Sequence, residues 1–231
     1  MRIVSYNTQG SIGMDGVRST RRIAEAVRIL VPDIICFQEI HKLLPWSAME
    51  NQPETLSKLL NREFVFQRNV PFGRGAYGIG IAARGTITHR INHMLASKKE
   101  SRGALEVRLL NVGGLSKLTV FCTHWGLDAE ERAWQGEALA SIVNASPGPK
   151  IICGDLNERS NCDGVLRLLE ITGLQDAGAA SNIPTYNALE PHARIDYCLF
   201  SPELKMTSFE VVNTLASDHR PLCIDLETTT S

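Results

Sequence analysis

The sequence lacks the features of a membrane, secreted or disulfide-linked protein. No apolar run approaches the roughly 18 residues of a membrane-spanning helix, and the opening stretch MRIVSYNTQG becomes polar too early for a signal peptide. The six cysteines form no CxxC pair. Four of them lie in apolar, strand-like runs: Cys36, Cys122, Cys153 and Cys198. Buried free thiols in a reducing compartment fit this pattern better than disulfide bonds, so we expect a cytoplasmic protein without a transmembrane segment.

An excess of charge of one sign is also missing. The chain has 24 Lys and Arg residues against 25 Asp and Glu residues, a formal net charge of −1. A near-neutral chain without a Lys/Arg-rich run is not a general binder of polyanions, although a local basic groove is compatible with that total. Nucleic acid is therefore a partner that the charge allows but does not favour. Low-complexity linkers and fixed-period repeats are absent as well, so we expect residues 1–231 to form one domain.

The apolar periodicity that is present predicts a sheet-rich α/β domain built in layers. In residues 18–30 the apolar side chains recur at helical spacing, and Pro32 ends that helix. Residues 33–38 (DIICFQ) form a continuous apolar run, which is typical of a strand buried on both faces. The same reasoning predicts further helices at 54–61, 129–143 and 164–170. It predicts further strands at 2–6, 64–68, 77–83, 104–112, 118–123, 150–154, 194–200, 207–213 and 221–226.

Polar side chains that can carry chemistry stand at the ends of these strands. They are Asn7, Glu39, His124, Asp155, Asn157, Asp196, Asp218 and His219. Burying so many charged groups is costly unless they bind a cation or one another. The carboxylate and amide oxygens among them are the hard donors that Mg²⁺ or Mn²⁺ prefers. Such an ion leaves positions for a phosphate oxygen, and the two histidines can supply acid–base catalysis beside it.

Six short motifs occur along the chain: NTQG (7–10), FQE (37–39), TH (123–124), GDLN (154–157), RIDY (194–197) and SDHRPL (217–222). In this order and spacing the chain resembles the endonuclease/exonuclease/phosphatase superfamily from residue 3 to about 226. The resemblance implies a four-layered α/β sandwich, in which two mixed sheets pack face to face with helices outside. It also implies that residues 1–231 are a single catalytic domain that hydrolyses a phosphoester with a divalent metal, through direct attack of a metal-positioned water.

The resemblance also implies roles for the metal-binding residues. Glu39 is similar to the principal metal carboxylate of the family, with Asn7 as its neighbour. Asp218 resembles a metal or water ligand beside them. A plain Asx-turn is an alternative role for Asn7. No Ser or Cys nucleophile is placed with a base in the expected site, so we expect no covalent intermediate.

The remaining motif residues resemble the family's catalytic groups. Asp155 is similar to the residue that orients or activates the attacking water, and Asn157 to one that holds the phosphate. His219 resembles the histidine at the scissile phosphate, and Asp196 the carboxylate that orients it. His124 stands where a leaving-group acid or phosphate ligand is expected, and a core histidine is the alternative.

The substrate is left open by this resemblance, because GIGIAARGTI (78–87) departs from the usual Ser-Arg-Phe/Tyr-Pro segment. Arg102, Trp46 and Arg74 are candidates for substrate binding. A surface ion pair is the alternative for Arg102, and a simple turn is the alternative for Arg74. A DNA endonuclease or exonuclease of the same fold, or an inactive binding module, are the alternative functions. Cys122, Cys153 and Cys198 lie two residues from site residues, and we expect them to fill the core, with a mixed Cys/His zinc site as the alternative.

Overall fold

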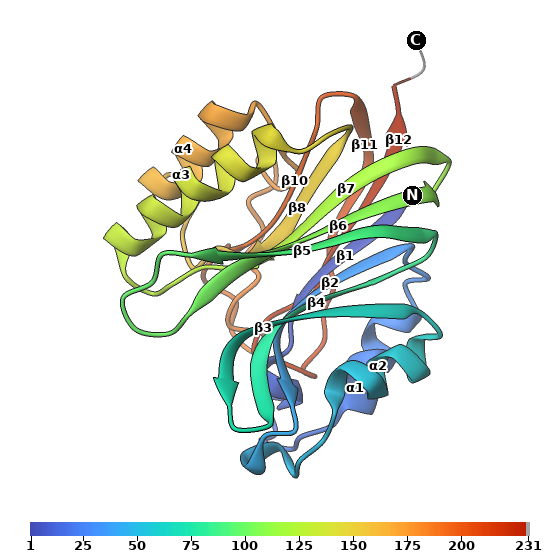
Figure 1. Ribbon diagram of the computed structural model, residues 1–231, viewed down its shortest axis with the longest axis vertical. Helices are drawn as coiled ribbons and strands as arrows, with labels where there is room; N and C mark the ends of the chain where they lie inside the picture. The colour runs from blue at the N-terminus through green and yellow to red at the C-terminus, as the bar shows by residue number, and fades with distance from the viewer. Residues whose placement is uncertain (230–231) are drawn as a thin grey trace.

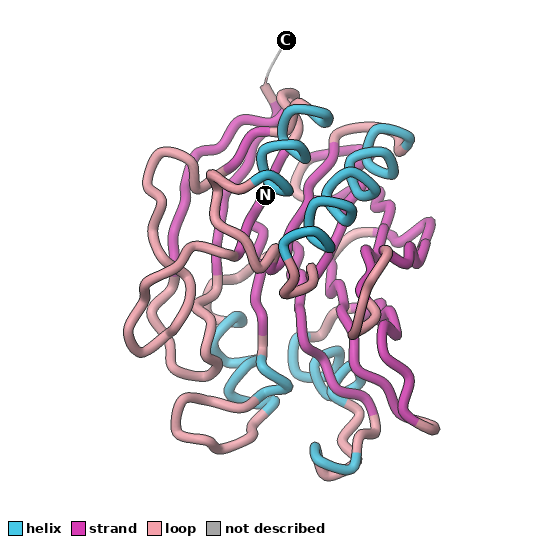
Figure 2. Tube along the Cα trace, turned by 90° about the vertical axis from the view of Figure 1, so that its left-hand side faces the viewer, coloured by secondary structure: helices cyan, strands magenta, loops and turns pink. Residues whose placement is uncertain are grey.

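Two six-stranded mixed β-sheets pack face to face, and each carries a pair of helices on its outer face (Figure 1). The computed structural model describes residues 1–229. Figure 2 shows the same layers from the side, with strands between helices. The predicted four-layered sandwich is confirmed.

The first sheet has the strand order β11-β12-β1-β2-β4-β3. Its strands in chain order are β1 (Arg2–Asn7), β2 (Ile34–Lys42), β3 (Glu63–Phe72), β4 (Gly75–Ala83), β11 (Leu204–Val211) and β12 (Leu222–Thr228). β1 and β2 are parallel, and the other pairs are antiparallel. Helices α1 (Thr20–Arg28) and α2 (Gln52–Leu60), with the short 3₁₀ turns η1 (Gln9–Ser11) and η2 (Pro45–Ser47), belong to this half of the molecule.

The second sheet has the strand order β5-β6-β7-β8-β10-β9. Its strands are β5 (Thr86–Leu95), β6 (Arg102–Val112), β7 (Leu115–His124), β8 (Lys150–Asp155), β9 (Gln175–Asp176) and β10 (Asp196–Phe200). β7 and β8 are parallel, and the other pairs are antiparallel. Helices α3 (Ala129–Ala145) and α4 (Asp163–Thr172) cover its outer face (Figure 1).

The helices begin and end where their sequences supply the backbone partners. The Ser19 side chain accepts a hydrogen bond from the Arg22 amide at the start of α1, and Asp128 does the same for Glu131 in α3. Gly173 ends α4 with φ 66°, a left-handed conformation that costs glycine little. The apolar face of α1 packs on the first sheet, which fixes the loop that follows β1 near the site.

The main core lies between the two sheets. Its members include Ile34 and Ile81 from the first sheet, and Val107, Val120 and Ile151 from the second. Each buried side chain of this size stabilises the fold by about 1.5–3 kcal/mol relative to an exposed one. This interior fixes the distance between the sheets, and therefore the distance between polar groups at their ends.

The predicted elements recur in the structure with two omissions. The sequence did not predict β5. Its residues form no apolar run, and only Leu95 among them is buried in the structure. β9 is a two-residue strand, too short to leave a pattern. Cys36, Cys122, Cys153 and Cys198 are buried and free of disulfide bonds. Within residues 1–229, no helix combines the length and hydrophobicity needed to cross a membrane.

Candidate active site

The strand register of the second sheet places three of the predicted site residues side by side. Asp155 lies opposite His124 in the parallel β7–β8 pair and opposite Asp196 in the antiparallel β8–β10 pair. All three side chains are almost completely buried. Because these residues are the last or first of their strands, the sheet holds their side chains at one edge as a rigid row.

Glu39 comes from the first sheet, where a β-bulge interrupts β2. The register with β4 shifts between Phe37 and Ile40, and Glu39 takes a left-handed φ of 58°. A bulge of this kind re-aims a side chain that regular alternation would turn elsewhere. Burial raises the pKa of the Glu39 carboxyl group, against the hydrogen bond from Asn7 and the positive charge of His219.

Asn7 connects the two sheets at this point. Its side-chain amide nitrogen donates to Oε1 of Glu39 at 3.0 Å and to Oδ2 of Asp155 at 2.9 Å. Its oxygen accepts a hydrogen bond from the Gln9 amide. The half-buried carboxylate of Glu39 and the buried one of Asp155 therefore converge on one donor, although they belong to different sheets.

His219 lies between two carboxylates. Its Nδ1 is 2.8 Å from Oδ2 of Asp196, and its Nε2 is 3.6 Å from Oδ2 of Asp155. Burial lowers the pKa of this imidazole, but the charges of Asp196 and Asp155 outweigh it and raise the pKa to about 10. The ring of Tyr186 packs against it, with 4.8 Å between ring centroids. His219 is thus a cation at neutral pH.

Asp155 is the centre of this network. Burial raises its pKa to about 7, although the charge of His219 acts in the opposite direction. Its Oδ1 accepts a hydrogen bond from the backbone amide of Asn157 at 2.9 Å. Asn157 takes a left-handed φ of 50°, which turns the chain sharply after β8. A carboxylate that titrates near neutrality is suited to accepting a proton from water.

His124 differs from His219 because its neighbours are cationic. Nη1 of Arg102 lies 3.0 Å from its Nδ1. A guanidinium can only donate, so Nδ1 is the acceptor and the proton of the neutral ring is on Nε2. The Nε2 proton therefore faces Oδ2 of Asp155 at 3.5 Å, while the side-chain nitrogen of Asn157, 3.1 Å from Nε2, donates to the Trp125 carbonyl. Burial, Arg102 and His219 all lower the pKa of His124 well below its ordinary value.

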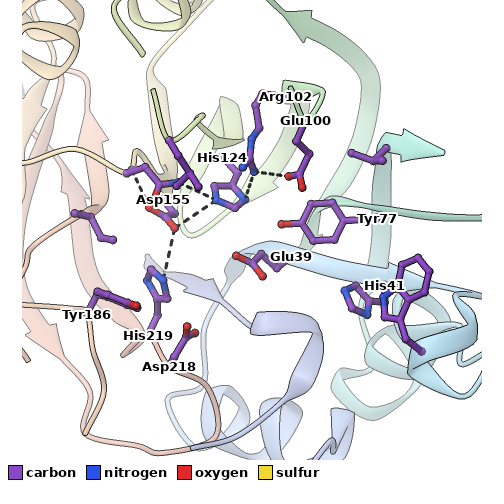
Figure 3. Close-up of a pocket in the computed structure, with 15 residues that line it drawn as sticks. Glu39, His41, Tyr77, Glu100, Arg102, His124, Asp155, Tyr186, Asp218 and His219 are labelled. Atoms are coloured by element: carbon purple, nitrogen blue, oxygen red, sulfur yellow. Dashed lines mark hydrogen bonds and ion pairs between the residues drawn. The ribbon is translucent and has the colours of Figure 1, made fainter. Parts of the chain in front are cut away.

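These side chains face a cavity of about 690 Å³ between the ends of the two sheets. Figure 3 shows His219, Asp218 and Tyr186 at one end and His41 at the other, with Glu39 between them. The lining residues are Glu39, His41, Trp46, Val70, Tyr77, Glu100, Arg102, His124, Leu127, Asp155, Asn157, Tyr186, Ile195, Asp218 and His219.

Most of the predicted site residues line this cavity, and two lie directly behind it. Asn7 and Asp196 contact the lining carboxylate and imidazole, as described above. Arg102, predicted as a substrate-binding candidate, lines the cavity as a buried side chain, 6% exposed, and it also forms an ion pair with Glu100 at 2.9 Å. Arg74 is not among the lining residues and lies in the exposed turn between β3 and β4.

Four lining residues with polar side chains were missed by sequence reasoning: His41, Tyr77, Glu100 and Tyr186. His41 follows Glu39 by two residues, and Glu100 precedes Arg102 by two, so proximity to a motif was the available signal. Tyr77 and Tyr186 stand in segments without a chemical motif, and only the tertiary fold brings them to the cavity. Burial raises the pKa of Tyr77 well above its ordinary value, and burial with the Arg18 charge lowers the pKa of His41 to about 4.

The carboxylate oxygens at this edge can hold a divalent cation. Within residues 1–229, one atom each of Asp155, Asp196 and His219 lies within 4.8 Å of the others, but the protonated imidazole of His219 has no free lone pair for a metal. Oδ1 of Asp196 is buried and has no hydrogen-bond partner among these residues. Of the predicted ligands, Asn7 and Glu39 are joined to Asp155 by the hydrogen bonds of Asn7, and Asp218 lines the same cavity.

Comparison with known proteins gives consistent results. The profile of the Endonuclease/Exonuclease/phosphatase family matches residues 4–219. Uncharacterized protein YbhP of Escherichia coli strain K12 is 31% identical over 147 residues, a match that covers 59% of this chain and 58% of YbhP. The chain is thus aligned with less than two thirds of that relative.

Two solved structures share the fold over nearly the whole chain. An endonuclease/exonuclease/phosphatase of Beutenbergia cavernae superposes with a TM-score of 0.86 at 22% identity, over 99% of this chain and 71% of that one. The mannosyl-6-phosphatase Bt3783 of Bacteroides thetaiotaomicron superposes with a TM-score of 0.79 at 17% identity, over 98% of this chain and 99% of that one. At these identities the likeness concerns the fold alone.

Proposed function

The chain belongs to the endonuclease/exonuclease/phosphatase family, whose members hydrolyse phosphoesters, and from this premise we propose that it is a divalent-metal-dependent phosphoester hydrolase. A water molecule attacks phosphorus directly, without a covalent enzyme intermediate. Residues 1–231 act as a single catalytic domain, and the buried free thiols favour a reducing cytoplasm. The observation that carries the proposal is the buried Asp196–His219–Asp155 network at the cavity floor.

The residues present fit a hard cation such as Mg²⁺ or Mn²⁺. Glu39 is half-buried and desolvation raises its pKa, so its carboxylate lacks a full compensating charge in the protein. Glu39 and Asn7 would hold the ion with Asp218 beside them, and the unpartnered oxygen of Asp196 is a further hard donor. When bound, the cation would polarise the phosphoryl group and offset developing negative charge.

Asp155 is the group that we assign to the attacking water. Its oxygens accept from Asn7 and Asn157, which fix the carboxylate plane, and its pKa of about 7 allows it to take a proton near neutrality. Burial and the rigid strand end hold it in one position, so the water is oriented before reaction. Asn157, at the same turn, contributes its amide to the phosphate.

His219 is the group that we assign to the phosphate. Asp196 fixes its tautomer and keeps it protonated, so a cationic N–H faces the cavity where negative charge develops. Two roles were expected for His124, leaving-group acid and phosphate ligand. The residue is neutral and paired with Arg102, which supports the role of phosphate ligand. Arg102 brings a buried guanidinium to the same wall, and its Nε has no partner among residues 1–229.

The proposal is tested by phosphate release from small monoesters and by hydrolysis of bis(p-nitrophenyl) phosphate, with Mg²⁺, with Mn²⁺ and with EDTA. We expect turnover of at least one class that EDTA abolishes and added metal restores. Nicking of supercoiled plasmid in the same conditions tests the nuclease alternative. Absence of turnover of every ester, with metal bound and the fold intact, would favour the inactive binding module.

A further inference from the structure

Three aromatic rings line the end of the cavity away from His219, and a fourth, Phe72, packs against one of them from outside the lining. His41 of β2, Trp46 of η2, Phe72 of β3 and Tyr77 of β4 make up this aromatic cluster. The centroid of His41 is 5.7 Å from that of Tyr77 and 6.4 Å from that of Trp46, and Trp46 meets Phe72 edge-on at 4.9 Å. Figure 3 shows His41 and Tyr77 on the opposite side of Glu39 from His219.

Two rings of the aromatic cluster are open to solvent. Trp46 is 55% exposed and Phe72 is 51% exposed. Neither ring, nor Tyr77, belongs to the three clusters of buried side chains that form the core of residues 1–229. Leaving large rings half exposed forgoes part of the free energy that full burial would give. The cluster is therefore an apolar surface beside the reacting groups that core packing does not explain.

The segment that carries Trp46 is held in place before any ligand binds. Leu44 is fully buried, and its carbonyl accepts hydrogen bonds from the amides of Ser47 and Met49, both at 3.0 Å. The Leu43 amide donates to the Glu50 carbonyl at 2.8 Å and closes the loop. A fixed ring loses little conformational entropy on binding, so stacking on Trp46 converts efficiently into affinity.

Polar groups accompany the rings. Nη1 of Arg18 lies 3.4 Å from Nδ1 of His41, so the proton of the neutral imidazole is on Nε2. The Tyr77 hydroxyl points toward Glu100 and Glu39 in Figure 3. Aromatic faces with hydroxyl, imidazole and carboxylate groups beside them suit a ring that carries its own polar substituents.

The charges of the lining favour a small ligand over a nucleic acid. Four carboxylates line the cavity, those of Glu39, Glu100, Asp155 and Asp218, against the single guanidinium of Arg102 and the charged His219. Binding of a polyanion needs basic side chains along the phosphate track on either side of the reacting bond. The volume of about 690 Å³ is that of a small-molecule site.

We propose that the aromatic cluster binds the ring of the alcohol in a small, ring-bearing phosphoester, such as a sugar phosphate or a nucleotide, whose phosphate lies at the Asp155–His219 end. This assignment rests on the proposed hydrolase function and adds its substrate class. Trp46 is the specificity-determining residue that distinguishes ring-bearing from acyclic phosphates, and Phe72 is a positioning residue that holds the Trp46 ring by packing against it.

The test compares kcat/KM for glucose 6-phosphate, adenosine 5′-monophosphate and glycerol 3-phosphate in wild type, Trp46→Ala and Phe72→Ala. Trp134→Ala is the matched control, because Trp134 is 43% exposed and lies on α3 under Lys98. In both cluster variants we expect the preference for the better ring-bearing phosphate over glycerol 3-phosphate to fall about 3- to 10-fold, as loss of an aromatic contact implies. The control keeps the wild-type preference, and the better ring identifies the ligand as sugar or nucleoside.

A wild-type enzyme with no preference for either ring, or a preference unchanged in both cluster variants, overturns the subsite and leaves the hydrolase proposal standing. If wild type hydrolyses none of the three, the hydrolase proposal fails for these esters, and calorimetric binding of the same three phosphates decides the subsite alone. The subsite is supported if wild type binds a ring-bearing phosphate more tightly than glycerol 3-phosphate and Trp46→Ala loses that difference. Equal binding of the three phosphates, or no binding of any of them, contradicts the subsite.

Discussion

Oδ2 of Asp196 lies 2.8 Å from Nδ1 of His219, and this buried contact fixes both the orientation and the charge of the imidazole. The pKa of His219 rises to about 10 because Asp196 and Asp155 outweigh the effect of burial. His124, which contacts Asp155 in the same network, has a lowered pKa because of its burial and because Arg102 faces it. Two histidines of one cavity are thus held in opposite charge states by their partners.

Replacing Asp196 by Asn should lower the rate and shift its pH dependence. The variant removes the largest influence that raises the pKa of His219, so the imidazole loses its proton at a lower pH than in wild type. We expect kcat to fall about 100-fold, and the alkaline limb of the pH–rate profile to move toward neutral pH. The profile of kcat against pH measures both effects. An unchanged alkaline limb would mean that His219 is not the group whose protonation the reaction needs.

Replacing Arg102 by Met should weaken substrate binding. Arg102 is buried between Glu100 and His124, and its side chain faces the phosphate end of the cavity. We expect KM to rise about tenfold or more in Arg102→Met, with partial recovery in Arg102→Lys, because lysine keeps the charge but not the planar fork. Steady-state kinetics on the best ester measures this. Equal KM values in all three proteins would return Arg102 to a structural role.

Replacing Glu39 by Gln should remove the stabilisation that a metal gives. A cation that binds only the folded state raises the melting temperature, by an amount that grows with the logarithm of its concentration relative to its Kd. We expect Mg²⁺ or Mn²⁺ to raise the melting temperature of wild type by a few degrees and to have little effect on Glu39→Gln. Glu170, an exposed residue of α4, supplies the control Glu170→Gln. Equal shifts in wild type and Glu39→Gln would place the ion elsewhere.

Replacing Asp225 by Asn should destabilise the protein at neutral pH but not in acid. Arg2 donates from Nε and Nη2 to the two oxygens of Asp225, at 2.8 and 2.7 Å, and lowers the pKa of that carboxyl group. A lowered pKa contributes stability that is present above the unfolded value and lost as pH falls through the folded one. We expect the free energy of unfolding at pH 7 to drop by about 1 kcal/mol, for a partly exposed pair. Urea denaturation should show a smaller difference between the two proteins near pH 3.

The layered fold was predictable because its buried strands carry continuous apolar runs. DIICFQ and KIICGD identify β2 and β8 without reference to their partners, and the site residues follow at their ends. β5 was not predictable, since an exposed strand whose side chains are mostly polar is specified by its pairing with β6 and by no pattern of its own.

The site residues also divide into those predictable from sequence and those that depend on the fold. Asp155, Asp196 and His219 stand in sequence motifs, so their residue types and their order along the chain were sufficient to predict them as site residues. The bulge at Glu39 and the Arg102–His124 contact depend on tertiary geometry, and so does the contact of Trp46 of η2 with Phe72 of β3. Arg74, a substrate-binding candidate with a simple turn as the alternative, lies on an exposed turn and is not among the residues that line the cavity.

The most direct test of the hydrolase account is the turnover number of Asp155→Asn with saturating Mg²⁺. The variant keeps the size of the side chain and removes the carboxylate that we assign to the attacking water. Asp163→Asn, at an exposed position at the start of α4, is the matched control. The account predicts a loss of at least about 100-fold, or about 3 kcal/mol of barrier, in Asp155→Asn and a wild-type rate in the control. A folded, metal-binding Asp155→Asn protein with a rate near that of wild type would contradict it.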